Sequence, residues 1–174
     1  VIKAAILNAK KNNQILLIEA TSNQVDQFGG YTGLTPIQFK HSVFEFAASL
    51  NFPEDKIILG GDHLGPNRWQ NEVASSAIQK AQVQIAAYVS AGFTKIHLDA
   101  SMKCFDDGDK NQSLHSSIIA ERSAILCKAS EEALTQSGNN DLPVYIIGTD
   151  VPPPGGAKEH QSNIHITSAA EVEE

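Results

Sequence analysis

Lys56-Ile-Ile-Leu-Gly-Gly-Asp-His-Leu-Gly-Pro-Asn-Arg-Trp69 is the stretch of sequence that decides the fold. Its apolar residues 57–59 predict a short buried strand, because β-branched runs of this length beside turn residues are typical of such strands. Two glycines follow, and then Asp62 and His63 lie where the strand is expected to end. Parallel α/β folds place their reacting groups at the carboxyl ends of strands. The stretch therefore predicts a carboxylate and an imidazole at a functional edge.

The same pattern occurs at three other places in the chain. Apolar runs at residues 14–21, 93–101 and 142–150 carry Glu19, Asp99 and Asp150 at or near their carboxyl ends. Segments with helical spacing of apolar residues separate the runs, at residues 36–50, about 70–91 and 113–137, and another precedes them at 1–10. This alternation predicts βα units in a parallel sheet or barrel. We expect one α/β domain over residues 1–174, with the acidic side chains on a common rim.

Two helices are expected to bury an apolar side, and one loop is rich in glycine. The stripe of residues 36–50 includes Phe46 and that of the next helix includes Val73, so both are expected in the core. Gly29-Gly-Tyr-Thr-Gly33 is interpreted as a loop that needs positive φ. A phosphate cradle is disfavoured there, because the loop has no GxGxxG spacing and no P-loop lysine.

Composition and charge exclude several classes of protein. The 174 residues carry a formal charge of −7 and the sequence pI is near 5.3, which disfavours nucleic acid and anionic membranes as partners. The sequence predicts no transmembrane helix, because its apolar runs have the length of strands, and it shows no signal-peptide pattern. Cys104 and Cys127 lack CxxC spacing and indicate reduced thiols, so a cytoplasmic protein is expected.

Four features have two interpretations each. His97 within a strand is more typical of a satisfied core histidine than of a ligand, whereas Asp99 at the strand end is a site candidate that can also cap the next loop. Trp69 can form a pocket wall or pack at the rim. Asp106-Asp-Gly-Asp109 resembles the start of a calcium loop but lacks its later ligands, so a solvated acidic turn is preferred.

Five segments together resemble a known family. They are Leu17-Ile-Glu-Ala-Thr-Ser-Asn-Gln-Val25, Gly29-Gly-Tyr-Thr-Gly-Leu-Thr-Pro36, Leu59-Gly-Gly-Asp-His-Leu-Gly-Pro-Asn-Arg-Trp69, His97-Leu-Asp-Ala-Ser-Met102 and Gly148-Thr-Asp-Val-Pro-Pro-Pro-Gly-Gly156. The sequence resembles the family of the non-catalytic subunit of D-tagatose-1,6-bisphosphate aldolase, which is related to class II aldolases. The resemblance implies part of a (β/α)8 TIM barrel, with about strands two to five present and the first strand and last three lacking.

The resemblance also implies roles for individual residues. Asp62 matches the proton-transfer carboxylate of class II aldolases and His63 matches a zinc ligand, while Asp99 and Asp150 match acidic positions after the next two strands. We assign these three aspartates to catalysis and His63 to metal binding. The polar residues Glu19, Asn23 and Ser101 are assigned to substrate binding. Zinc is the expected cofactor, although a catalytic zinc needs about three protein ligands and the resemblance supplies one here.

The function implied is that of an auxiliary subunit. Such a subunit is needed for the activity and stability of a class II aldolase catalytic subunit in tagatose and galactitol breakdown. The catalytic subunit is therefore the expected partner, a sugar phosphate a possible ligand, and an oligomer the expected state. Two alternatives stay open: a zinc-dependent class II aldolase that is active in its own right, and a tagatose-6-phosphate kinase, for which no Walker-type motif is present.

Overall fold

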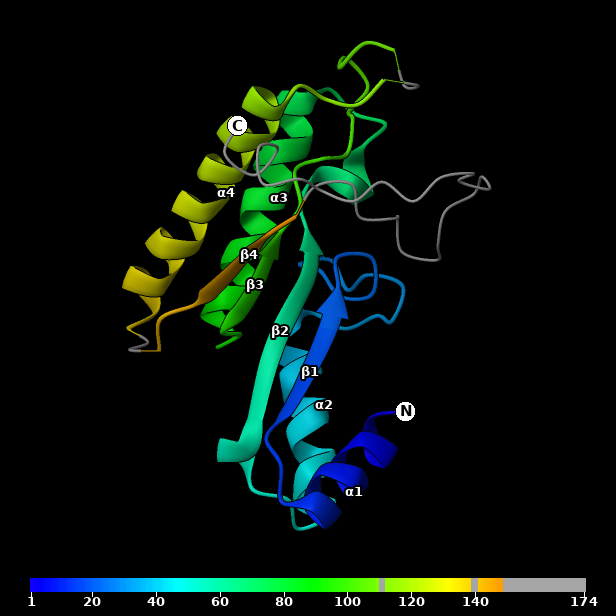
Figure 1. Ribbon diagram of the computed structural model, residues 1–174, viewed down its shortest axis with the longest axis vertical. Coiled ribbons are helices and arrows are strands. Elements are labelled where there is room, and N and C mark those ends of the chain that lie inside the picture. Colours follow the sequence, from blue (N-terminus) through cyan, green and yellow to red (C-terminus); the bar gives the residue numbers. More distant parts are fainter. Residues whose placement is uncertain (110–111, 139–140, 149–174) are drawn as a thin grey trace.

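The computed structural model describes residues 1–109, 112–138 and 141–148, in which helices and strands alternate. In chain order they are α1 (Ile2–Asn12), β1 (Leu16–Thr21), α2 (Pro36–Ser49), the 3-10 helix η1 (Glu54–Lys56), β2 (Ile57–Leu64), the 3-10 helix η2 (Pro66–Trp69), α3 (Ala74–Ser90), β3 (Lys95–Leu98), α4 (Ser116–Ser137) and β4 (Val144–Ile147). The strands form one parallel sheet in the order β1-β2-β3-β4 (Figure 1). This is an α/β fold and part of a TIM-type barrel, as predicted.

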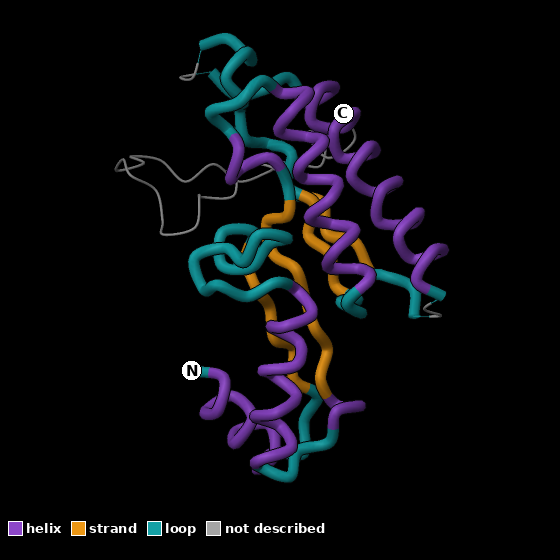
Figure 2. Tube along the Cα trace, turned by 180° about the vertical axis from the view of Figure 1, so that it is seen from behind, coloured by secondary structure: helices purple, strands orange, loops and turns teal. Residues whose placement is uncertain are grey.

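The helices cover one face of the sheet. Figures 1 and 2 show the sheet from opposite sides, with the helices behind it in the first view and in front of it in the second. Burial alternates along β1, where Ile18 and Ala20 are buried and Leu17 and Glu19 are exposed. Paired residues of parallel strands point to the same side, so the register extends this division to all four strands. We call the side without helices the open face; its residues include Leu17, Glu19, Ile58, Asp62, Lys95, His97, Val144 and Ile146.

The main core lies between the other face of the sheet and α2, α3 and α4. Trp69 is 7% exposed and belongs to this core. The expectation that Phe46 and Val73 are buried was wrong: they are 36% and 44% exposed. Val73 is the N-cap of α3, because η2 delays the start of that helix to Ala74. Phe46 lies on the outer side of α2, with the Lys3 ammonium 5.4 Å from its ring.

The acidic turn after β3 is exposed at Asp106, Gly108 and Asp109, as expected of a solvated turn, whereas Asp107 is partly buried. Arg122 of α4 donates from both terminal nitrogens to the carboxylate of Asp107, at 2.8 and 2.5 Å. Asp107 also accepts from the backbone N–H of Cys104 at 2.6 Å, and Asp106 accepts from the N–H of Ala74 at 2.7 Å. The turn therefore joins the starts of α3 and α4. The sequence did not predict the pair of Asp107 and Arg122, because the arginine lies 15 residues further along the chain.

Two smaller expectations concern cysteines and membranes. Cys104 and Cys127 are both free thiols, as expected. No helix in the described ranges has the length and apolar character needed to cross a bilayer.

Candidate functional site

Asp62 is the centre of a hydrogen-bonded cluster on the open face. One of its carboxylate oxygens lies 2.8 Å from Nδ1 of His63, and the other lies 2.9 Å from Nδ1 of His97. The two imidazole rings are 4.6 Å apart between centroids and tilted by 58°. One carboxylate thus holds two imidazoles, one from its own strand β2 and one from the neighbouring strand β3.

The backbone of β2 is irregular where it presents this cluster. The pairing with β3 shifts between Gly61 and Leu64, and His63 in this interval has φ 51°. This left-handed conformation costs an ordinary residue about 1 to 2 kcal/mol. The irregularity turns the His63 ring toward Asp62, whereas regular alternation would send adjacent side chains to opposite faces. The strand also extends to Leu64, so Asp62 and His63 lie within β2 and not after its end.

Beside the cluster, an ion pair reaches across β2 and joins β1 to β3. Lys95 of β3 pairs with Glu19 of β1, and its ammonium lies 3.5 Å from an Asp62 oxygen. Gly60 of β2 lies beneath this pair, and a Cβ there would be 2.8 Å from Cγ of Glu19 and 3.1 Å from Cδ of Lys95. The glycine therefore leaves the space in which β1 and β3 make contact across β2.

The surroundings of Asp62 determine its charge. Burial alone would raise the pKa of Asp62, but the hydrogen bonds from His97 and His63 act against it, together with the charges of His63 and Lys95. The net result is a pKa lowered from the ordinary value. Asp62 is therefore an anion at neutral pH that accepts protons weakly.

Asp99 and Ser101 lie together just beyond β3. An oxygen of Asp99 accepts from the backbone N–H of Ser101 at 3.1 Å and from its hydroxyl at 2.6 Å. The Asp99 side chain is buried, with 3% of the residue exposed. These contacts are those of a loop cap, the structural interpretation of Asp99. Gly65 permits the close approach of the two loops, because a Cβ there would overlap the backbone carbonyl oxygen of Asp99.

The glycine-rich loop after β1 is organised by Asp26. Its carboxylate accepts from the backbone N–H groups of Phe28 and Gly30, at 2.6 and 3.0 Å, and forms an ion pair with Arg68 of η2. Gly29, Gly30 and Gly33 have positive φ, which confirms the interpretation as a loop that needs this conformation. Two of the N–H groups that a phosphate would need are already bound to a carboxylate of this chain.

The structure brings some of the predicted site residues together and leaves others apart. Glu19, Asp62 and His63 share the open face, joined there by Lys95 and His97, to which the sequence had assigned no site role. Alternation along Lys95-Ile-His-Leu98 was the available signal, since it places residues 95 and 97 on one side of β3. The other predicted residues lie apart from this group: Asp99 and Ser101 form a pair in the next loop, Asn23 lies in the loop after β1, and Asp150 lies outside the described residues.

His97 is buried as expected of a core histidine, but its hydrogen bonding is incomplete. The side chain is 7% exposed, and Nε2 is buried without a hydrogen-bond partner among the described residues. Nε2 of His63 is in the same situation. Asp62, His63 and His97 each offer one ligand atom, a carboxylate oxygen or one of the two ring nitrogens, and these three atoms lie within 4.8 Å of one another. Nitrogen and carboxylate donors of this kind fit a divalent transition metal such as zinc.

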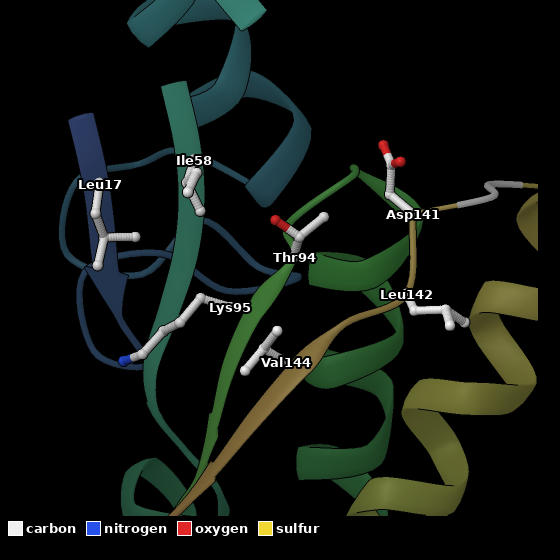
Figure 3. Close-up of a pocket in the computed structure, with 7 residues that line it drawn as sticks. All are labelled: Leu17, Ile58, Thr94, Lys95, Asp141, Leu142 and Val144. Atoms are coloured by element: carbon white, nitrogen blue, oxygen red, sulfur yellow. The ribbon is translucent and has the colours of Figure 1, made fainter. Parts of the chain in front are cut away.

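A groove of about 510 Å³ lies on the open face, toward the amino ends of the strands (Figure 3). Leu17, Ile58, Thr94, Lys95, Asp141, Leu142 and Val144 line it. Figure 3 shows the Lys95 side chain extending from β3 across β2 toward β1. Lys95 therefore belongs both to the groove and to the charged cluster, which lies nearer the carboxyl ends of the strands.

Two comparisons relate this chain to known proteins. The family described as "D-tagatose-1,6-bisphosphate aldolase subunit GatZ/KbaZ-like" matches residues 1–174. A crystal structure described as a probable tagatose 6 phosphate kinase from Sinorhizobium meliloti 1021 is similar with 48% sequence identity and a TM-score of 0.78. The match covers 86% of this chain and 36% of that one, so the chain spans little more than a third of that protein.

Proposed function

Because this chain belongs to the GatZ/KbaZ-like family of D-tagatose-1,6-bisphosphate aldolase subunits, we propose that it acts as an auxiliary subunit. In this role it binds a class II aldolase catalytic subunit and supports the stability and activity of that partner in tagatose or galactitol breakdown. The proposal places the protein in a hetero-oligomer in the cytoplasm, with a sugar phosphate as the ligand of the assembled complex.

The observation that carries the proposal is that the acidic side chains of the site already have hydrogen-bond or ion-pair partners within this chain. Glu19 is paired with Lys95, Asp62 with two imidazoles, and Asp99 with Ser101. A general base works best when its pKa lies near the operating pH, whereas the pKa of Asp62 is lowered. This arrangement favours a structural role for the site over proton transfer.

The second candidate is an active zinc-dependent aldolase, and the cluster of Asp62, His63 and His97 is the observation that favours it. In this alternative His63 is a metal ligand, and a bound zinc ion supplies Lewis-acid polarisation of a ketose carbonyl. The proton-transfer carboxylates are then Asp62, Asp99 and Asp150, and the substrate contacts are Glu19, Asn23 and Ser101.

The kinase description of the similar crystal structure supplies a third candidate, which has less support. In the described part of this chain, the glycine-rich loop uses the N–H groups of Phe28 and Gly30 to hold Asp26. A phosphate cradle at this loop would first have to displace that carboxylate.

Co-purification tests the proposal. The full-length protein is co-expressed with a tagged class II tagatose-bisphosphate aldolase, and the melting temperature and cleavage rate of the aldolase are measured with and without it. We expect co-elution, a higher melting temperature and a faster rate, and no turnover by the protein alone. Zinc-dependent turnover by the protein alone would establish the second candidate. An unchanged melting temperature and rate of the aldolase would overturn the auxiliary role.

A further inference from the structure

We propose that a groove along α3 and α4 is the surface through which this chain binds the aldolase catalytic subunit, and that it takes an amphipathic helix with basic flanks. The inference rests on the auxiliary role proposed above. It adds to that role the place where the partner binds and the chemistry of the segment that the partner presents.

Two hollows on the surface of α3 and α4 meet at Gln82, and together we call them the helix groove. Figures 1 and 2 show that the two helices run side by side. The hollows have volumes of about 400 and 270 Å³, and Gln82 lines both. On α4 the lining residues extend from Ile118 to Gln136, which is about 27 Å at 1.5 Å per residue. The helix groove therefore has the length of a helix of about five turns.

The helix groove has an apolar floor that the described part of the chain leaves uncovered. Ile118 and Ile125 of α4 are 37% and 36% exposed, and Val83 of α3 is 53% exposed. Ile118 and Ile125 are seven residues apart and lie on the same face of α4. The small side chain of Ala129 leaves room in the second hollow for a side chain of the partner. Helices that bind in grooves present apolar residues at i, i+3 or i+4 and i+7, which suits such a floor.

The charges of the helix groove favour a basic partner. Glu121 is exposed near one end and has no ion-pair partner in the ranges that the structure describes. Arg122 follows it, but both terminal nitrogens of this arginine donate to Asp107. Glu132 near the other end is 60% exposed and lies 3.8 Å from the exposed Lys128, a surface pair that contributes little. The lining residues of α3 are uncharged, so the two glutamates set the sign of the charge.

The same two glutamates disfavour a second copy of this chain as the occupant. If two copies packed with their helix grooves antiparallel, Glu121 of each would face Glu132 of the other. In the parallel orientation each glutamate would face its own equivalent. Like charges would be opposed in both cases, whereas lysine or arginine side chains flanking the apolar stripe of a different protein would pair with them.

Binding of the tagged class II tagatose-bisphosphate aldolase to the full-length protein tests the helix groove. The variants are Ile125→Asp and the double charge reversal Glu121→Lys with Glu132→Lys. The control is Glu131→Lys, which is exposed on the same helix but lines a different hollow beside β4. We expect affinity at least about tenfold lower in both groove variants and unchanged affinity in the control. Added salt should weaken the wild-type complex more than that of the charge-reversal variant.

The outcomes separate this inference from the auxiliary role. If the wild type binds the aldolase and both groove variants bind it equally well, the helix groove is not the docking surface and the auxiliary role stands. If the wild type does not bind the aldolase, the auxiliary role fails and this inference fails with it. Sedimentation that finds a wild-type dimer and monomeric groove variants would assign the helix groove to a second copy instead. Circular dichroism checks folding, and if Ile125→Asp is unfolded, the charge reversal at two exposed positions decides.

Discussion

Asp62, Lys95 and His97 show how far the site depends on contacts between strands. The sequence identified Asp62 and His63 because they follow an apolar run and two glycines, where the strand was expected to end. Lys95 and His97 lie more than 30 residues away and reach Asp62 only through the register of β3 on β2. A single sequence contains the alternation of β3 but not that register, so it could not show which side chains face the carboxylate.

The pair of Asp107 and Arg122 makes the free energy of unfolding depend on pH. The hydrogen bonds from Arg122 are the largest cause that holds the pKa of Asp107 below its ordinary value of 3.8, against the effect of burial. The unfolded chain therefore binds a proton here more readily than the folded one. The stability that this carboxylate contributes is fully present above its unfolded pKa and is lost as the pH falls through its folded pKa.

We therefore expect Asp107→Asn to weaken the dependence of stability on pH. The free energy of unfolding is measured with denaturant at pH 7 and at several values down to pH 3.5. The wild type should lose more stability than the variant over this range. Asp55→Asn on the exposed surface of η1 is the control and should retain the wild-type slope. Parallel curves for wild type and Asp107→Asn would contradict the role of the pair.

At the scale of elements, the end of β2 and the loop after β3 are packed in close contact. The N–H of Asp99 donates to the carbonyl of Leu64 at 2.9 Å, and Gly65 lies against the carbonyl of Asp99. The sequence shows Gly65 before Pro66, a combination that is typical of turns. It could not predict this contact, because the contact joins two loops that are far apart in the chain.

Gly65→Ala should lower the free energy of unfolding by about 1 to 3 kcal/mol, because the new methyl group forces the two loops apart. Gly108→Ala is the matched control: no atom lies near its Cβ position, and its φ of 78° alone costs about 1 kcal/mol. Denaturant unfolding of the full-length proteins measures both. A smaller loss for Gly65→Ala than for Gly108→Ala would contradict the close approach.

At the scale of the whole molecule, the alternation of apolar runs and helical segments was enough to predict parallel strands joined by helices, but not that the helices cover one face of the sheet. The groove at the amino ends of the strands was not predicted, because it depends on which side chains the open face leaves uncovered. Leu17, Ile58 and Val144 line it and are between 40% and 66% exposed. In a complete barrel this face is the packed interior.

We therefore expect Ile58→Asp to destabilise the full-length protein by about 3 kcal/mol or more, because it would bury an unpaired charge. Val83→Asp on α3 is the control; Val83 is 53% exposed, and its replacement should change the unfolding free energy by about 0.5 kcal/mol at most. Small and equal effects of both changes would show that water reaches the open face in the full-length protein.

The central claim is that one carboxylate on the open face holds two imidazoles from adjacent parallel strands. A crystal structure of the full-length protein tests it most directly, through the distances from the Asp62 oxygens to Nδ1 of His63 and Nδ1 of His97. We predict that both are close to 3 Å, the length of a hydrogen bond, and that the cluster lies inside the barrel. A structure in which His97 points to the helices, away from Asp62, would contradict the account.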